Sequence, residues 1–217
     1  MEREIQLPMG VVSGWCAPEF EPLLEAFVRN FTDRGELGAS LALIQGEQVL
    51  VDLRGGFVDQ GRQRPWQPDT LCVVHSCTKA AVALCLHLLI DQGRVSLNDP
   101  VSRYWPEYDQ SGKGDTTVAM LLSHTSGLPA LNTALKPGAF LDWDYMTQTL
   151  AQAAPLWVPG SEHGYQMTTF GWLVGELVRR ISGQSLGAFF RQWIAEPLGA
   201  DFWIGLPVSA HHRVARL

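Results

Sequence analysis

The stretch His75-Ser76-Cys77-Thr78-Lys79-Ala80 determines how the rest of the chain is interpreted, and an apolar segment follows it directly. The pattern of residues 77–92 predicts a helix that ends at Gly93. Residues three positions apart share one face of a helix. The hydroxyl of Ser76 and the amine of Lys79 can therefore meet if Ser76 is the first helical residue. The helix is apolar on nearly all sides, so we expect it to lie inside the protein.

This S-x-x-K pattern has a chemical and a structural interpretation. Serine is a poor nucleophile without an adjacent base, and lysine can act as that base only when burial lowers its pKa well below ~10.4. Backbone N–H groups at the start of a helix can also stabilise an oxyanion. In the structural interpretation Ser76 is only a helix cap and Lys79 is solvated. The motif alone does not decide between the two, because it is short.

The segments before the motif predict one helix and one hairpin. After an irregular start, residues 18–33 have apolar side chains at helical spacing. Residues 39–44 and 49–53 predict two short strands joined by a turn. We expect an exposed loop at 57–70 and a short strand or extended segment at 71–75.

The segments after the motif predict mainly helices. These helices cover residues 116–124, 142–153, 168–182 and 186–195. A helix, then a hairpin, then many helices is an α+β order and not a series of alternating βαβ units. We expect one domain over residues 1–217.

Composition excludes several classes of function. The 217 residues carry 16 Lys+Arg against 22 Asp+Glu, a net charge of -6, and 46% are hydrophobic. This is enough apolar material for a core, and the absence of a basic run argues against nucleic acid as a partner. No apolar run reaches the ~18 residues of a membrane span, and no signal peptide is visible. The four cysteines predict buried free thiols in a reducing, cytoplasmic compartment.

Five strings in order connect the chain to a known family. They are His75-Ser76-Cys77-Thr78-Lys79-Ala80, Ser96-Leu97-Asn98-Asp99-Pro100-Val101, Leu121-Leu122-Ser123-His124-Thr125-Ser126-Gly127-Leu128, Pro159-Gly160 leading to Tyr165 and Phe170-Gly171-Trp172-Leu173, and Glu196-Pro197-Leu198-Gly199. Together they resemble the serine β-lactamase and penicillin-recognising superfamily, in particular its class C-like branch that includes carboxylesterases. The resemblance covers residues 20–205 and implies a β-lactamase/transpeptidase-like fold.

The resemblance implies three catalytic residues. Ser76 corresponds to the acylated nucleophile, Lys79 to its hydrogen-bonded partner, and Tyr165 to the tyrosine of the family's second motif. Either the lysine or the tyrosine could take the serine proton, and the sequence leaves both open. The structural interpretation of Tyr165 is a half-buried packing side chain. His124 is interpreted as part of a structural turn beside the site.

The chain departs from the family pattern in two places. Met167 stands where β-lactamases have the asparagine of Tyr-x-Asn, so a carboxamide that binds amide substrates is replaced by a thioether. This change favours esters. The third motif, on a late strand that supplies an oxyanion-hole N–H, has no counterpart at the expected distance. Trp203-Ile204-Gly205 matches its letters but comes too early.

The leading expectation is a serine hydrolase that forms an acyl-enzyme, a carboxylesterase on short-chain esters. The alternatives are a β-lactamase or D-Ala peptidase, and a binding protein or non-catalytic fragment that retains the fold. We expect no cofactor and no metal, because His211-His212 lack companion ligands and fit a solvated tail. The expected partner is a small-molecule ester, with no nucleic acid or membrane. The oligomeric state is left open. The chain resembles an N-terminal portion of the family, without its later sheet strands, and is expected to be a poor catalyst alone.

Overall fold

The computed structural model describes residues 1–216, which form two compact units. The first unit comprises Met1–Val73 together with the segment from Leu206 onward, and the second comprises Val74–Gly205. All three candidate catalytic residues belong to the second unit. A single domain over residues 1–217 remains a prediction.

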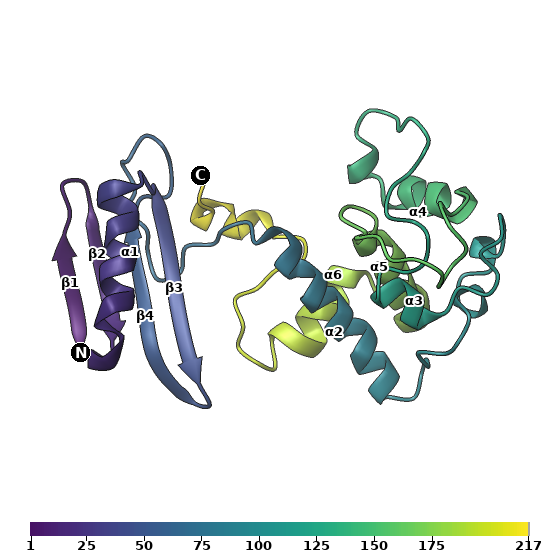
Figure 1. Cartoon of the computed structure of the whole chain (residues 1–217), viewed down its shortest axis with the longest axis horizontal. Coiled ribbons are helices and arrows are strands. Elements are labelled where there is room, and N and C mark those ends of the chain that lie inside the picture. Colours follow the sequence, from purple (N-terminus) through teal and green to yellow (C-terminus); the bar gives the residue numbers. More distant parts are fainter. Residues whose placement is uncertain (217) are drawn as a thin grey trace. The chain divides into compact units, whose positions relative to one another are not determined.

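A four-stranded antiparallel sheet forms the first unit, in the order β1-β2-β4-β3 (Figure 1). The strands are β1 (Glu2–Gln6), β2 (Val11–Cys16), β3 (Gly38–Gln45) and β4 (Gln48–Gly56). The hairpin of β3 and β4 was predicted, with a register shift between Leu43 and Ile44. The expectation of an irregular start is wrong, because residues 2–16 form two of the four strands.

Helix α1 (Glu21–Asp33) lies across one face of this sheet (Figure 1), after a 3₁₀ turn at Pro18–Phe20. Its buried residues Leu24 and Phe27 pack against the sheet residues Val12, Val51 and Leu53. The apolar stripe of residues 18–33 therefore has the role that its spacing predicts.

The first unit is completed by two segments far apart in the sequence. The amide of Leu71 donates to Arg213 O at 3.0 Å, and the amide of Ala215 donates to Leu71 O at 2.8 Å. A 3₁₀ helix at Val208–Arg213 precedes this pairing. One prediction is corrected here: residues 57–70 are not wholly exposed, because Val58 and Trp66 are buried. Residues 71–75 were predicted as a strand or an extended segment, and Leu71 makes an isolated bridge with Val214 there.

The second unit is helical. Its α-helices are α2 (Thr78–Asp91), α3 (Val118–Leu122), α4 (Trp143–Gln152), α5 (Phe170–Ser182) and α6 (Leu186–Phe190). Short 3₁₀ turns lie at His75–Cys77, Val101–Arg103, Pro106–Tyr108 and Ala139–Leu141. All five predicted helices exist. The last one is α6 followed by a π-helical turn at Arg191–Ala195, so its hydrogen-bonding pattern changes halfway.

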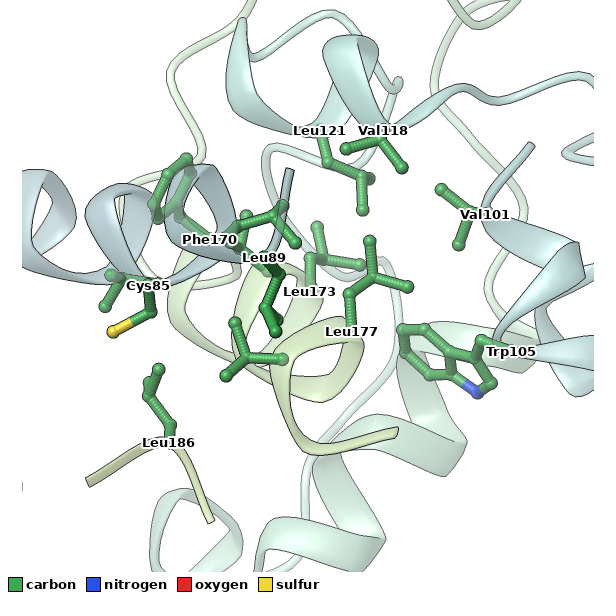
Figure 2. Close-up of a cluster of buried hydrophobic side chains, with 14 of the residues drawn as sticks. Cys85, Leu89, Val101, Trp105, Val118, Leu121, Phe170, Leu173, Leu177 and Leu186 are labelled. Carbon is green, nitrogen blue, oxygen red and sulfur yellow. The ribbon is translucent and has the colours of Figure 1, made fainter. Parts of the chain in front are cut away.

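The core of the second unit lies between α2 and α5 (Figure 2). Leu89 of α2 and Leu173 and Leu177 of α5 are fully buried there, and Leu121 of α3 contributes to the same cluster. Helix α2 is less enclosed than its composition predicts, because the side chain of Leu84 is 55% exposed. The helix buries one face, and it is not covered on all sides.

The cysteines are free, as expected, but only two of them are buried. Cys16 and Cys85 are enclosed, whereas Cys72 and Cys77 are exposed. Both exposed cysteines precede α2, in an exposed stretch of the chain. No helix among residues 1–216 is long and apolar enough to cross a membrane.

Candidate active site

Ser76 lies in the short 3₁₀ turn that runs directly into α2. The residue before it, His75, has a φ of 45°, a left-handed conformation that few residues other than glycine adopt. The Ser76 side chain is exposed. Its backbone N–H lies in the first turn of the helical run, where N–H groups have no acceptor within the helix. The nucleophile candidate is therefore accessible, and a backbone donor lies beside it.

Lys79 lies one helical turn after Ser76 and contacts two segments of the site. Its Nζ donates to Ser76 Oγ at 3.1 Å and to the backbone oxygen of Met167 at 2.9 Å. The same Nζ lies 4.7 Å from the centroid of the Tyr165 ring. A carbonyl oxygen and the face of an aromatic ring both attract a positive charge.

Tyr165 completes a group of three with Ser76 and Lys79. Hydrogen bonds with Ser76, first, and with Lys79, second, lower the pKa of its phenol, and the positive charge of Lys79 adds to this. The side chain is 48% exposed, so its phenol is accessible to a substrate. The structure thus brings the three predicted residues together, although they come from positions 76, 79 and 165.

His124 lies behind Tyr165 and is bound to the segment that carries it. The backbone N–H of Gln166 donates to His124 Nδ1 at 3.1 Å, and the N–H of Gly164 donates to the backbone oxygen of His124 at 3.1 Å. The His124 ring also contacts Tyr165 and Phe170, each with ring centroids 5.0 Å apart. The turn at His124 is therefore a direct support of Tyr165. Its sequence alone predicted only a turn.

Met167 follows in the second motif and faces solvent. Its side chain is 66% exposed, while its backbone oxygen accepts the hydrogen bond from Lys79. The side chain that replaces the family's asparagine therefore offers no hydrogen-bonding group beside the lysine.

The remaining candidates have contacts of their own. The indole N–H of Trp203 donates to Asp201 at 2.7 Å, and the guanidinium of Arg191 lies over its ring at 4.3 Å. His211 and His212 belong to the first unit, in its 3₁₀ helix Val208–Arg213. Among residues 1–216, no group of three or more His, Cys, Asp or Glu side chains could hold a metal ion.

Comparison with known proteins places this arrangement in a family. The family model described as Beta-lactamase matches residues 24–217. The chain belongs to this beta-lactamase family. The resemblance of the five sequence strings is confirmed, and so is the α+β, β-lactamase/transpeptidase-like fold.

Relatives in the beta-lactamase family include esterases. The Esterase/beta-lactamase LipL of Mycobacterium tuberculosis is 35% identical over 208 residues, which are 95% of this chain and 48% of that protein. A penicillin-binding protein homologue from Caulobacter crescentus superposes with a TM-score of 0.91 at 45% identity, covering 95% of this chain and 56% of that one. A family VIII carboxylesterase gives 0.89 at 43% identity, covering 95% and 57%. The chain spans about half the length of the curated relatives it matches.

Sequence reasoning identified the family's three residues but missed the role of His124 as a support. The string Leu121-Leu122-Ser123-His124-Thr125-Ser126-Gly127-Leu128 was visible, and so was the second motif. One string contains a histidine and another string of the same site contains a tyrosine. These two aromatic residues are the signal that could have connected the strings. The hydrogen bond from the Gln166 amide to His124 joins residues 42 positions apart, which spacing does not predict.

Proposed function

We propose that this chain carries the acylation machinery of a serine carboxylesterase that acts on short-chain esters. The observation that carries the proposal is the contact of Lys79 Nζ with Ser76 Oγ at 3.1 Å, with the Tyr165 ring centroid 4.7 Å from the same Nζ. A nucleophile within hydrogen-bond reach of its base, with a third group that orients the pair, is the arrangement that acyl transfer requires. The relationship to LipL and to a family VIII carboxylesterase supports the same reaction class.

In the proposed reaction Tyr165 is the base and Lys79 is its fixed cation. Ser76 Oγ attacks the ester carbonyl while its proton passes to the phenolate of Tyr165. The tetrahedral intermediate then breaks the bond to the alcohol oxygen, which receives that proton from Tyr165. The N–H of Ser76 supplies one oxyanion donor. Water releases the acyl group in a second cycle of the same transfers.

Esters are favoured over β-lactams because of Met167. A carboxamide at this position would pair with an amide of the substrate, and a thioether cannot replace it. The alternative is the β-lactamase or D-Ala peptidase reaction, which the similarity to a penicillin-binding protein homologue keeps in view. Nitrocefin and a short p-nitrophenyl ester, compared at equal enzyme concentration, separate the two. Faster turnover of nitrocefin would reverse the preference.

Covalent labelling tests the proposal directly. A fluorophosphonate probe reacts with a serine only where a base activates it, so mass spectrometry of the labelled peptide should find the probe on Ser76. Ser76→Ala should remove the label, and Ser161→Ala, a change at another exposed serine, should retain it. Label on a different serine contradicts the proposal and points to another nucleophile. No label on a folded chain also contradicts it and favours a non-catalytic binding protein.

A further inference from the structure

Tyr165 is held from both sides by one residue. The amides of Gly164 and Gln166, which immediately precede and follow it, donate to the backbone oxygen and to the Nδ1 of His124, each at 3.1 Å. The tyrosine backbone is thus bound to a single histidine through main chain and side chain. Any movement of the His124 ring therefore changes the hydrogen bond to the Gln166 amide.

The histidine is itself held in an unusual conformation. His124 has a φ of 62°, and its ring lies half-buried between the rings of Tyr165 and Phe170. A left-handed residue other than glycine is strained and persists only where its surroundings require it. Here the end of α3 fixes the chain, since the N–H groups of His124 and Thr125 donate to Leu121 O and Met120 O.

The bond to Gln166 depends on the charge of the ring. A backbone amide can only donate, so Nδ1 must be unprotonated and the ring carries its proton on Nε2. Protonation of Nδ1 would place its N–H opposite the N–H of Gln166. Two donors cannot form a hydrogen bond, so the bond would break. Burial, first, lowers the pKa of His124, and the nearby His163 and Lys79 lower it further. These two groups and Tyr165 are the titratable side chains that face the ring.

We propose that His124 is a positioning residue. It holds the Tyr165 phenol at Ser76 and Lys79 through the Gln166 amide, and it releases that segment when the ring is protonated. This inference rests on the proposed function, because it assigns His124 a part in the same acylation step. It adds a second, proton-dependent requirement to that step.

Two variants separate the acceptor from the bulk of the ring. His124→Ala removes the acceptor, and a displaced Tyr165 should lower the rate constant for fluorophosphonate labelling of Ser76 about 10- to 100-fold. His124→Asn supplies a side-chain oxygen in place of Nδ1, and asparagine tolerates the left-handed conformation. It should recover most of the loss. Equal losses in both variants, with both folded by circular dichroism, would overturn the proposal.

The pH profile tests the proton dependence. Protonation of Tyr165 makes the logarithm of the labelling rate fall with a slope of one as the pH decreases. Below ~6.5, the usual histidine pKa, protonation of His124 should steepen this slope towards two. The Asn variant cannot titrate and should keep a slope of one. His163→Asn, a change at the exposed neighbouring ring, is the matched control and should still steepen. A steepening that survives in His124→Asn contradicts the assignment.

Nitrogen-15 NMR of the imidazole groups gives a readout that needs no activity. At neutral pH, His124 should show an unprotonated Nδ1 and a protonated Nε2, and the Gln166 amide signal should shift as the ring titrates. A proton on Nδ1 at neutral pH would disprove the bond. If the parent chain shows this signature but Ser76 is never labelled, then the proposed function fails and the positioning role fails with it, although the hydrogen bond stands. If Ser76 is labelled and the variants behave alike, only the role of His124 fails.

Discussion

Lys79 makes contacts that suit a cation more than a base. Two oxygens, Ser76 Oγ and Met167 O, accept its hydrogen bonds, and the Tyr165 ring lies beneath it. The side chain is only partly buried, so the strong desolvation expected from an apolar helix is incomplete. Hydrogen bonding with Ser76, first, and with Lys79 lowers the pKa of Tyr165, and the positive charge of Lys79 adds to this, so its phenolate is favoured. The sequence left open whether the lysine or the tyrosine takes the serine proton, and on these contacts we propose the tyrosine.

Removing the charge of Lys79 should shift the pH dependence as well as the rate. In Lys79→Met, Tyr165 loses one of the interactions that lower its pKa, so the acid limb of kcat should move to higher pH. We expect kcat at neutral pH to fall about 10²-fold with a smaller change in KM. Ester hydrolysis measured from pH 5 to 10 checks both effects.

The companion variant Lys79→Arg decides what the lysine does. Guanidinium stays charged, so it should keep the acid limb near its original pH even where its different shape lowers the rate. If Lys79 were the base, the Arg variant would be as inactive as Met and would show no acid limb. That outcome would contradict the role given to Tyr165.

The spacing of single residues predicted only the local part of the site. Ser76 and Lys79 are three positions apart on a helix, so the 3.1 Å contact follows from helix geometry. The contacts of Tyr165 with that pair and with His124 come from chain folding across about 40 to 90 positions, and only the resemblance to a family suggested Tyr165. No local pattern distinguishes a histidine that anchors a tyrosine from one in a turn.

The C-terminal end of helix α4 contacts a buried lysine that no pattern in the sequence distinguishes. Lys113 is fully enclosed, and its Nζ donates to Gln110 O at 2.9 Å, Ala151 O at 3.0 Å and Ala153 O at 2.6 Å. Burial lowers the pKa of Lys113 to about 8. Two of the three acceptors are carbonyls at the C-terminal end of α4, which attract a positive charge. The lysine therefore replaces a conventional helix cap.

Lys113→Met should destabilise the chain markedly. The thioether fills a similar volume but leaves the carbonyls without their donor, so the free energy of unfolding should fall by about 2–4 kcal/mol. Lys136→Met is the matched control. Lys136 lies over a tyrosine ring of α4 and pairs with Asp142, but its side chain is 47% exposed. Lys136→Met should lower the free energy of unfolding by less than ~1 kcal/mol. Urea denaturation followed by tryptophan fluorescence measures both, and equal costs would contradict the capping role.

The two strands that the sequence did not predict each lack the usual strand pattern, for different reasons. Strand β1 alternates between exposed and half-buried residues and carries three charges within Glu2–Gln6, so it lacks an apolar signal. Strand β2 contains Gly14, which usually indicates a turn. A Cβ added at Gly14 would lie 2.0 Å from the backbone oxygen of Asp52 on β4. The glycine is there because two backbones approach closely within the sheet.

The order of elements along the chain was enough to predict the fold class. A hairpin followed by five helices indicated α+β, and five short strings in family order specified which α+β fold. The division into two compact units, each with its own apolar cluster, was not predicted, because it depends on the pairing of residues 206–216 with the segment 58–71. Such contacts between distant segments leave no periodic signal in the sequence.

The second unit should lose stability in acid. Four of its carboxyl groups have a pKa below the ordinary value in the folded chain, and these are Asp99, Glu107, Asp142 and Glu176. Glu176 is the most enclosed of them. Burial raises its pKa, but hydrogen bonds from Arg179, Arg180 and Trp143 outweigh burial and lower it overall. Its Oε1 accepts from both arginines at 2.7 Å.

The direction of the pH dependence follows from this lowered pKa. An unfolded glutamate titrates near ~4.3, so the stabilisation from Glu176 is complete above that pH and is lost as the pH falls through its folded value. Glu176→Gln should lower the free energy of unfolding by about 3 kcal/mol at pH 7, because the arginines lose a buried partner. The difference from the parent should shrink between pH 4 and pH 3, where the parent loses the same interaction.

Glu107→Gln supplies the control for this test. Glu107 also pairs with Arg180, at 2.8 Å, but its side chain is 62% exposed, so solvent screens the pair and the change should cost less than ~1 kcal/mol at any pH. Urea denaturation at pH 7, 5, 4 and 3 gives the free energy of unfolding of the parent and of both variants at each pH. A cost of Glu176→Gln that stays constant down to pH 3 would show that acid acts elsewhere in the molecule. A cost of Glu107→Gln as large as that of Glu176→Gln would show that burial does not set the strength of this network.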